Sequence, residues 1–137
     1  MAREFRLRRR VQFAETDLAG VLHFSNYLRL MEEAEHAFWR SLGLSVVMER
    51  DDGKVSWPRV AVRCEYFAPA RFEDELDLRV IVAEIGEKSL RLEVEFQRGH
   101  ALLARGEMKM VCCRMAQGAF SSIPIPDDIR ARLDGSV

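Results

Sequence analysis

The sequence predicts an α+β fold in which one long helix packs against an antiparallel sheet of five strands. A single long segment, about residues 25–42, repeats its apolar residues with helical spacing. The strand-like segments alternate apolar and polar residues, and most of them are separated by short turns. Short connections join antiparallel strands, and a helix with one apolar stripe must bury that stripe against the sheet. This combination is the α+β arrangement.

The first element is predicted to be a strand over residues 5–13, where apolar and polar residues alternate. Five arginines crowd this end of the chain: Arg3, Arg6, Arg8, Arg9 and Arg10. We interpret them as the solvated face of the strand. The opposite, apolar face would then carry Phe5, Leu7, Val11 and Phe13. A local contact of the arginines with an anion stays open as an alternative.

The helix is predicted to follow a polar turn at residues 15–20 and to end at Gly43. Its apolar stripe is formed by Tyr27, Leu30, Met31, Ala34, Phe38 and Leu42. Its charged and polar residues lie mainly away from that stripe: Arg29, Glu32, Glu33, Glu35, His36 and Arg40. Such a helix has one face for the core and one for solvent.

Beyond the helix, a polar connection is predicted to reach about residue 55. Four further strands are then expected, at about residues 57–67, 76–82, 90–97 and 101–115. Breaks are expected at Pro69, around Gly86 and around Gly99. After Pro124 and Pro126, a short helix is predicted to open at Asp127.

The composition limits the classes of function. A chain of 137 residues fits a single domain, here residues 1–137. Lysine plus arginine (21) nearly balance aspartate plus glutamate (22), without the basic excess expected of a protein that binds nucleic acid or an anionic membrane. No window is apolar enough to span a bilayer. The three cysteines, Cys64, Cys112 and Cys113, lie in apolar surroundings, so free thiols and a cytoplasmic location are expected.

The segment 13–27 carries the candidate chemistry. It places the Asp17 carboxylate in a turn, then Gly20, then the start of the helix. The unpaired N–H groups of a helix N-terminus can stabilise an oxyanion, and Asp17 could attack as nucleophile or activate water as base. A thioester suits this equipment, because a thiol of pKa about 8.5 leaves with little acid assistance. The spacing alone also fits an aspartate that only forms the turn.

The same segment resembles the active-site motif of the 4-hydroxybenzoyl-CoA thioesterase-like family of hotdog-fold thioesterases. That motif has an aromatic residue, Thr or Cys followed by Asp, and then Gly with a hydrophobic residue. Here it reads Phe13, Thr16, Asp17, Gly20 and Val21, followed by the sequence His-Phe-Ser-Asn-Tyr at 23–27. The helix at 27–34 and the closing Ile-Pro-Ile-Pro-Asp at 123–127 are also similar. The resemblance implies a hotdog fold and hydrolysis of an acyl-CoA to free acid and CoA.

Carried over by position, the resemblance makes Asp17 the catalytic carboxylate. Backbone N–H groups around His23 and Phe24 would polarise the thioester carbonyl. His23 departs from the Tyr or Phe that is frequent there. Its imidazole could orient water or the acyl group, or could simply bond to backbone at the start of the helix, and both interpretations stay open. Glu32 matches a glutamate common in the family's helix. Glu32 and Glu33 are therefore alternatives to Asp17 as the catalytic carboxylate; the other interpretation is that both lie on a solvated face or make a structural contact.

The resemblance also suggests residues that bind the substrate. Gly20, Asn26 and Tyr27 would lie near the acyl group, although Tyr27 also begins the apolar stripe and fits the core. Lys88 and Ser89, in the hairpin after Gly86, would meet the CoA phosphates. Arg91 and Arg114 are weaker candidates for that role. An ordinary surface position is the alternative for each of these four residues.

Neither a cofactor nor a metal is expected. Coenzyme A is part of the substrate, and the Glu-x-x-His spacing at Glu33 and His36 would be needed on two helices to bind a metal pair. A thiol nucleophile at Cys112 or Cys113, acting with His100, is disfavoured because an apolar strand suits a thiolate poorly.

The resemblance implies a homotetramer, a dimer of dimers, with active sites at the dimer interface. The sequence alone indicates only that sheet edges and uncovered apolar area favour association. Two other functions stay open: hydrolysis of acyl groups from an acidic acyl carrier protein, met by the N-terminal arginines, and non-catalytic binding of acyl-CoA.

Overall fold

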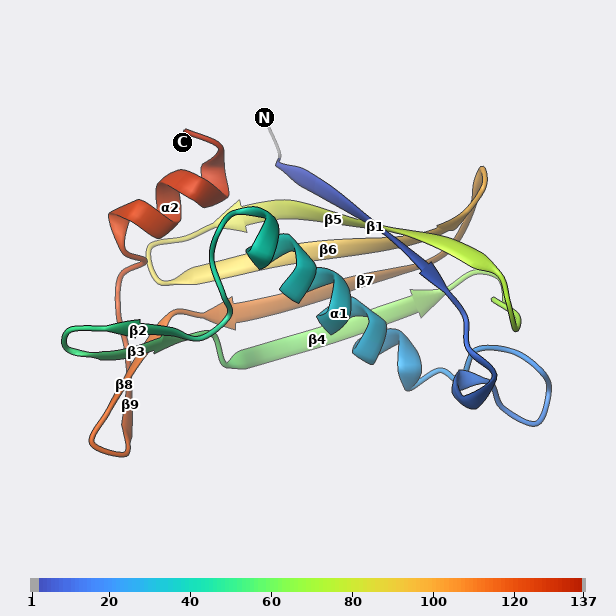
Figure 1. The fold of residues 1–137 in the computed structure, drawn as a ribbon, viewed down its shortest axis with the longest axis horizontal. Helices are drawn as coiled ribbons and strands as arrows, with labels where there is room; N and C mark the ends of the chain where they lie inside the picture. Colours follow the sequence, from blue (N-terminus) through green and yellow to red (C-terminus); the bar gives the residue numbers. More distant parts are fainter. Residues whose placement is uncertain (1–2, 137) are drawn as a thin grey trace.

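One long helix lies against a five-stranded sheet in the computed structural model, which describes residues 3–136 (Figure 1). The helix is α1 (Asn26–Ser41). The strands of the sheet are β1 (Glu4–Arg10), β4 (Arg59–Tyr66), β5 (Glu75–Ile85), β6 (Ser89–Arg98) and β7 (Ala101–Val111). They run in the order β1-β5-β6-β7-β4, and every neighbouring pair is antiparallel. The predicted α+β arrangement is therefore confirmed.

The apolar stripe of α1 is buried against the sheet, as its spacing predicts. The helix comes so close to β7 that a Cβ added to Gly106 would lie 2.4 Å from the sulfur of Met31. The helix ends as predicted: Gly43 has a φ of +74°, and the N–H of Leu44 reaches back to the carbonyl of Trp39 at 2.9 Å. The close packing at Gly106 sets how α1 rests on the sheet.

The prediction that Glu35 lies on the polar side of α1 is wrong, because its side chain is 0% exposed. The carboxylate pairs with the Arg59 guanidinium of β4 and accepts a hydrogen bond from Trp39 Nε1 at 2.9 Å. These partners make burial of the charge tolerable. Arg59 is 24 residues away in the sequence, so no local pattern reveals this partner.

The first strand is shorter than predicted. It ends at Arg10, and a 3-10 turn, η1 (Phe13–Glu15), follows with Phe13 76% exposed. Arg6, Arg8 and Arg10 are exposed as expected. Arg9 is not solvated, however, because alternate strand residues share a face and Arg9 lies on the side of Phe5 and Leu7. Its side chain is only 15% exposed and is paired with two carboxylates.

The predicted strand at 101–115 is broken at Cys112. Its N–H donates to the carbonyl of Lys88 at 2.7 Å, and its carbonyl accepts from the N–H of Ile123 at 2.9 Å. The chain then enters a second sheet, which the sequence analysis missed. It has the order β2-β3-β8-β9 and consists of β2 (Met48–Arg50), β3 (Gly53–Ser56), β8 (Cys113–Ala116) and β9 (Ala119–Ser122).

The predicted C-terminal helix is present as α2 (Asp127–Asp134), with Ile129 and Leu133 buried. Arg130 donates to the carbonyl of Gly86 at 2.6 Å and so ties α2 to the β5–β6 turn. That turn lies at one end of the sheet, whereas the loop between β1 and α1 lies at the other end (Figure 1).

Candidate active site

Asp17 lies at the start of a tight turn that backbone hydrogen bonds hold closed. Its N–H donates to the carbonyl of Val21 at 2.8 Å, and Thr16 pairs with Leu22 across the turn. Asp17 Oδ1 accepts the N–H groups of Ala19 at 2.9 Å and Val21 at 3.3 Å. Within residues 3–136, Asp17 Oδ2 accepts no hydrogen bond. The turn therefore orients the carboxylate and leaves one oxygen available.

Gly20 closes this turn with a backbone conformation that favours glycine. Its φ is +79°, and its N–H donates to the carbonyl of Asp17 at 2.9 Å. A residue with a Cβ rarely adopts such a φ. Glycine at this position in the motif thus has a structural reason.

The N–H groups of His23 and Phe24, the two predicted oxyanion donors, differ in whether they already have a partner. The N–H of His23 donates to the carbonyl of Glu15 at 2.9 Å, and that of Asn26 donates to the carbonyl of His23 at 2.9 Å. For the N–H of Phe24, the described part of the chain supplies no acceptor. Of the two predicted oxyanion donors, Phe24 is the one left unpaired.

A cavity of about 370 Å³ joins these groups. It lies between the Asp17 turn, the start of α1 and the end of β4. Its lining consists of Asp17, Val21, Leu22, Phe24, Tyr27, Tyr66, Phe67, Ala68 and Pro69. Asp17 thus borders a space whose other walls are mostly apolar and aromatic.

Two tyrosines form one wall of this cavity. Tyr27 is 3% exposed, so it belongs to the core as well as to the lining, and its ring meets Tyr66 edge-on at 4.8 Å between centroids. The hydroxyl of Tyr66 donates to the carbonyl of Phe24 at 3.0 Å. Burial raises the pKa of Tyr27, and burial with the neighbouring Cys64 raises that of Tyr66 to about 12. Both hydroxyls therefore stay protonated near neutral pH.

His23 and Asn26 point elsewhere. The His23 ring stacks on Phe24 at 4.6 Å, and its Nδ1 lies 2.8 Å from Ser25 Oγ. Asn26 Nδ2 donates to the carbonyl of Glu15 at 2.8 Å. Neither residue lines the cavity. Their observed contacts hold the start of α1, and a catalytic role for His23 or a substrate contact for Asn26 stays a prediction.

Lys88 and Ser89 lie far from Asp17 within one chain. Ser89 pairs with Val111, whereas Tyr66 pairs with Ala104, seven residues away on β7. At about 3.3 Å per residue the two ends are roughly 23 Å apart. The weaker candidates are paired with acids: Arg91 lies 3.1 Å from Glu93, and Arg114 lies 2.9 Å from Asp52.

The alternative carboxylates and thiols also lie outside the Asp17 cavity. Glu33 is paired with Arg9 at 3.0 Å, and Glu32 lines a different cavity of about 450 Å³. All three cysteines are free, and burial raises the pKa of the Cys112 thiol to about 11. That thiol is therefore a poor nucleophile at neutral pH.

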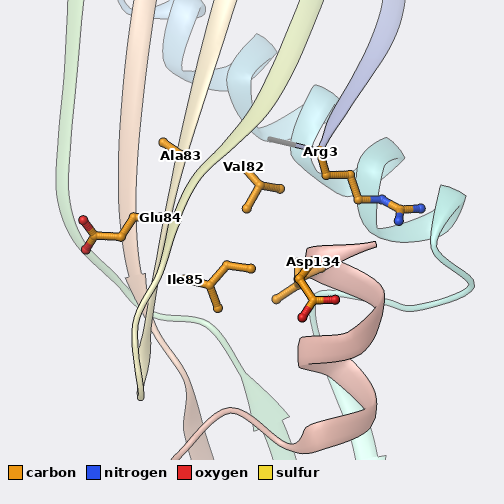
Figure 2. Close-up of a pocket in the computed structure, with 7 residues that line it drawn as sticks. Arg3, Val82, Ala83, Glu84, Ile85 and Asp134 are labelled. Carbon is orange, nitrogen blue, oxygen red and sulfur yellow. The ribbon is translucent and has the colours of Figure 1, made fainter. Parts of the chain in front are cut away.

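Another cavity, of about 410 Å³, separates the end of β5 from α2 (Figure 2). Arg3 and Asp134 approach it from different elements, while Glu84 extends to the opposite side of β5. Among residues 3–136 no three His, Cys, Asp or Glu side chains gather closely enough to hold a metal ion. Within the same range, no helix has the length and apolar character needed to cross a membrane.

The chain is similar in sequence and in fold to known thioesterases. A model of the thioesterase-like superfamily matches residues 11–133. A 1,4-dihydroxy-2-naphthoyl-CoA hydrolase of Synechocystis is 27% identical over 124 residues, which cover 89% of this chain and 90% of that protein. The structure of a gentisyl-coenzyme A thioesterase is 32% identical, with a TM-score of 0.80 over 92% of this chain and 99% of that one.

A 4-hydroxybenzoyl-CoA thioesterase shares the fold at lower identity. It is 18% identical, with a TM-score of 0.81 over 96% of this chain and 99% of that chain. The resemblance and the hotdog fold predicted from the sequence are therefore confirmed. The chain belongs to the thioesterase-like superfamily and is similar, along nearly its full length, to thioester hydrolases that act on acyl-CoA.

Proposed function

We propose that this chain hydrolyses an acyl-CoA thioester to the free acid and CoA, with Asp17 as its catalytic carboxylate. One observation carries the proposal: Asp17, whose carboxylate has an unbonded oxygen, and Phe24, whose N–H is unpaired, line the same cavity. A carbonyl carbon bound there would have a carboxylate on one side. Its oxygen would have a donor at a helix N-terminus, where the partial charge is positive.

Two routes use these groups. In one, Asp17 takes a proton from water while the water oxygen bonds to the carbonyl carbon; the tetrahedral intermediate then collapses and releases the CoA thiolate. In the other, an Asp17 oxygen bonds to the carbonyl carbon, the thiolate leaves, and water hydrolyses the mixed anhydride. In both routes the Phe24 N–H stabilises the oxyanion. A thiolate leaves readily because its acid has a pKa of about 8.5.

A hydroxylated aromatic acyl group is our first candidate. The two relatives above act on 1,4-dihydroxy-2-naphthoyl-CoA and gentisyl-CoA by their names. The cavity supports this choice, because Phe24, Tyr27, Tyr66 and Phe67 all contribute to its lining. Aromatic rings pack favourably edge-on or offset against such walls.

The test is release of the CoA thiol from a series of aromatic and aliphatic acyl-CoAs by the wild type and by Asp17→Asn. Asparagine keeps the Oδ1 acceptor that closes the turn and removes the charge. We expect kcat to fall about 10²–10⁴-fold while the fold and assembly are unchanged. Glu32→Gln serves as the matched control and should retain activity. Activity that is indifferent to Asp17 but lost in Glu32→Gln would move the catalytic role to Glu32.

Two other functions would give different results. For a carrier-protein thioesterase, the same acyl group should be released faster from acyl carrier protein than from CoA. A non-catalytic binding protein would retain acyl-CoA without turnover. The Asp17–Gly20 turn favours an enzyme over a binding protein, and the balanced charge of the chain does not favour an acidic carrier.

We further propose a cytoplasmic homotetramer assembled as a dimer of dimers. β4 is an edge strand that exposes Val60, Val62 and Tyr66. Antiparallel pairing of two β4 edges about a two-fold axis would turn the partner so that its β5–β6 turn lies at the Asp17 end. This supports a role for the partner's Lys88 and Ser89 in binding CoA phosphates. Light scattering of Val62→Arg, which should lose the paired edge, tests the assembly; an unchanged mass would contradict it.

A further inference from the structure

Arg9, on the inward side of β1, joins two segments that flank the Asp17 turn. Its Nε and Nη2 each donate to the Glu33 carboxylate of α1 at 3.0 Å. Its Nη1 donates to Glu15 Oε1 at 2.8 Å, and Nη2 pairs with the other oxygen of Glu15. One guanidinium thus holds two carboxylates, and the side chains of Arg9 and Glu15 are largely buried.

Glu15 continues this connection through its own backbone. Its carbonyl accepts the N–H of His23 at 2.9 Å and the side-chain amide of Asn26 at 2.8 Å. Its carboxylate also accepts the N–H of Gln12 at 2.8 Å. Glu15 precedes Asp17 by two residues, and His23 precedes Phe24 by one. The Glu15 carbonyl therefore fixes the carboxylate-bearing turn to the residue just before the free N–H.

We propose that Arg9 and Glu15 are positioning residues, which set the separation between the Asp17 carboxylate and the Phe24 N–H without touching substrate. Neither residue lines the Asp17 cavity. The proposal rests on the function proposed above. It adds that reactivity at this site depends on the ion pair between Arg9 of β1 and Glu15.

The charges explain why arginine is required. Without Arg9, the carboxylates of Glu15 and Glu33 would face each other unpaired, and their repulsion would push η1 away from α1. Lysine would supply a charge but not the planar fork that bonds two carboxylates at once. Burial alone would raise the pKa of Glu15, but hydrogen bonds from Arg9 and the Gln12 N–H outweigh it and hold that pKa below its ordinary value. Glu15 therefore stays ionised near neutral pH.

The kinetic test compares Arg9→Gln, Glu15→Gln and the double variant with Arg79→Gln. Arg79 is a matched control: it bridges Glu4 at 3.0 Å and Glu95 at 2.9 Å, away from the Asp17 cavity. We expect kcat of the Arg9 and Glu15 variants to fall on the order of 10–100-fold, the scale of a small misplacement of reacting groups. KM should change little, and the double variant should be no slower than the worse single variant. Arg9→Lys should recover only part of the loss.

An activity-independent measurement separates this inference from the proposed function. Amide hydrogen exchange at Asp17 and His23, well below the melting temperature, should be faster in Arg9→Gln than in the wild type and unchanged in Arg79→Gln. The amide of Val94, within β6, reports whether the sheet is intact. If Arg9→Gln does not fold, Glu15→Gln is used, because glutamine still accepts from Gln12.

Unchanged exchange at Asp17 and His23 would overturn the inference, whether or not the protein hydrolyses thioesters. So would a kcat loss in Arg79→Gln equal to that in Arg9→Gln. A wild type without thiol release would instead refute the proposed function, and the exchange experiment would still decide the structural link.

Discussion

The hydroxyl of Tyr66, at the end of β4, donates a hydrogen bond of 3.0 Å to the carbonyl oxygen of Phe24, just before α1. This bond joins an edge strand to the segment that carries the free N–H of Phe24. Tyr66 and Phe24 are both part of the cavity lining. The shape of the cavity therefore depends on a contact between residues that are 42 positions apart in the chain.

Tyr66→Phe should reduce kcat/KM about fivefold, because it removes one hydrogen bond worth about 1 kcal/mol and keeps the ring. The pKa of Tyr66 is raised to about 12, so the hydroxyl remains a donor throughout the neutral range. The ratio of wild-type to variant kcat/KM should then be constant between roughly pH 6 and 9. A ratio that changes with pH in this range would show that Tyr66 itself titrates during the reaction.

Gly20→Ala should lower both stability and activity. Nothing lies within 4 Å of the added Cβ, so the cost comes from the φ of +79° and should be about 1–2 kcal/mol. Gly118, in the β8–β9 turn, has a φ of +77° and equally open space. Gly118→Ala should lower the melting temperature similarly and leave kcat unchanged. Equal losses of kcat in both variants would contradict a specific role for the Asp17 turn.

Gly106→Ala should destabilise the protein by about 1–3 kcal/mol, the usual cost of overpacking a core. The new Cβ would lie 2.4 Å from the end of Met31, which is fully buried. Met31→Ala leaves a cavity at the same place, which the new Cβ can fill. The double variant should therefore lose less free energy of unfolding than the sum of the losses in the two single variants. Denaturant unfolding of the three variants measures this, and strictly additive losses would argue against direct contact.

Glu35→Gln should change how stability depends on pH. Burial raises the pKa of Glu35 and outweighs the attraction of Arg59. Its folded-state pKa therefore exceeds the unfolded value, and its contribution to stability falls as pH rises from the ordinary carboxyl range through the raised pKa.

Glutamine cannot ionise and still accepts the Trp39 hydrogen bond. The free energy of unfolding of the wild type, relative to Glu35→Gln, should accordingly decline as pH rises from about 4. Denaturant titrations at several pH values provide the measurement, with Glu49→Gln as an exposed control. A difference that stays flat or grows with pH would refute the raised pKa.

The elements with long, regular periodicity were predictable, and the short ones were not. α1 and the long strands β5, β6 and β7 repeat their apolar residues over many positions. The spacing of those residues is therefore enough to tell a helix from a strand. The strands of the second sheet have three or four residues each, too few for a period to show. Cys112 ended a predicted strand because its hydrogen bonds go to Lys88 and Ile123, partners that no local pattern reveals.

The candidate site divides in the same way. The turn from Asp17 to Val21 closes on itself, so a motif of a few residues was enough to predict it. Tyr66 and Phe67 reach the cavity from a distant strand, and only the fold brings them there. The family resemblance suggested Lys88 and Ser89 because they lie in a hairpin. It did not indicate at which end of the sheet that hairpin lies.

The Asp17 turn is closed by main-chain groups and by Asp17 itself, whereas the Leu18 side chain is fully exposed. Leu18 and Ala19 can therefore be replaced at little cost to the geometry that orients the carboxylate. These two positions lie in the chain between Asp17 and Val21, which both line the cavity. A library randomised there could alter substrate preference while the reaction itself is retained, which makes this turn a practical starting point for engineering.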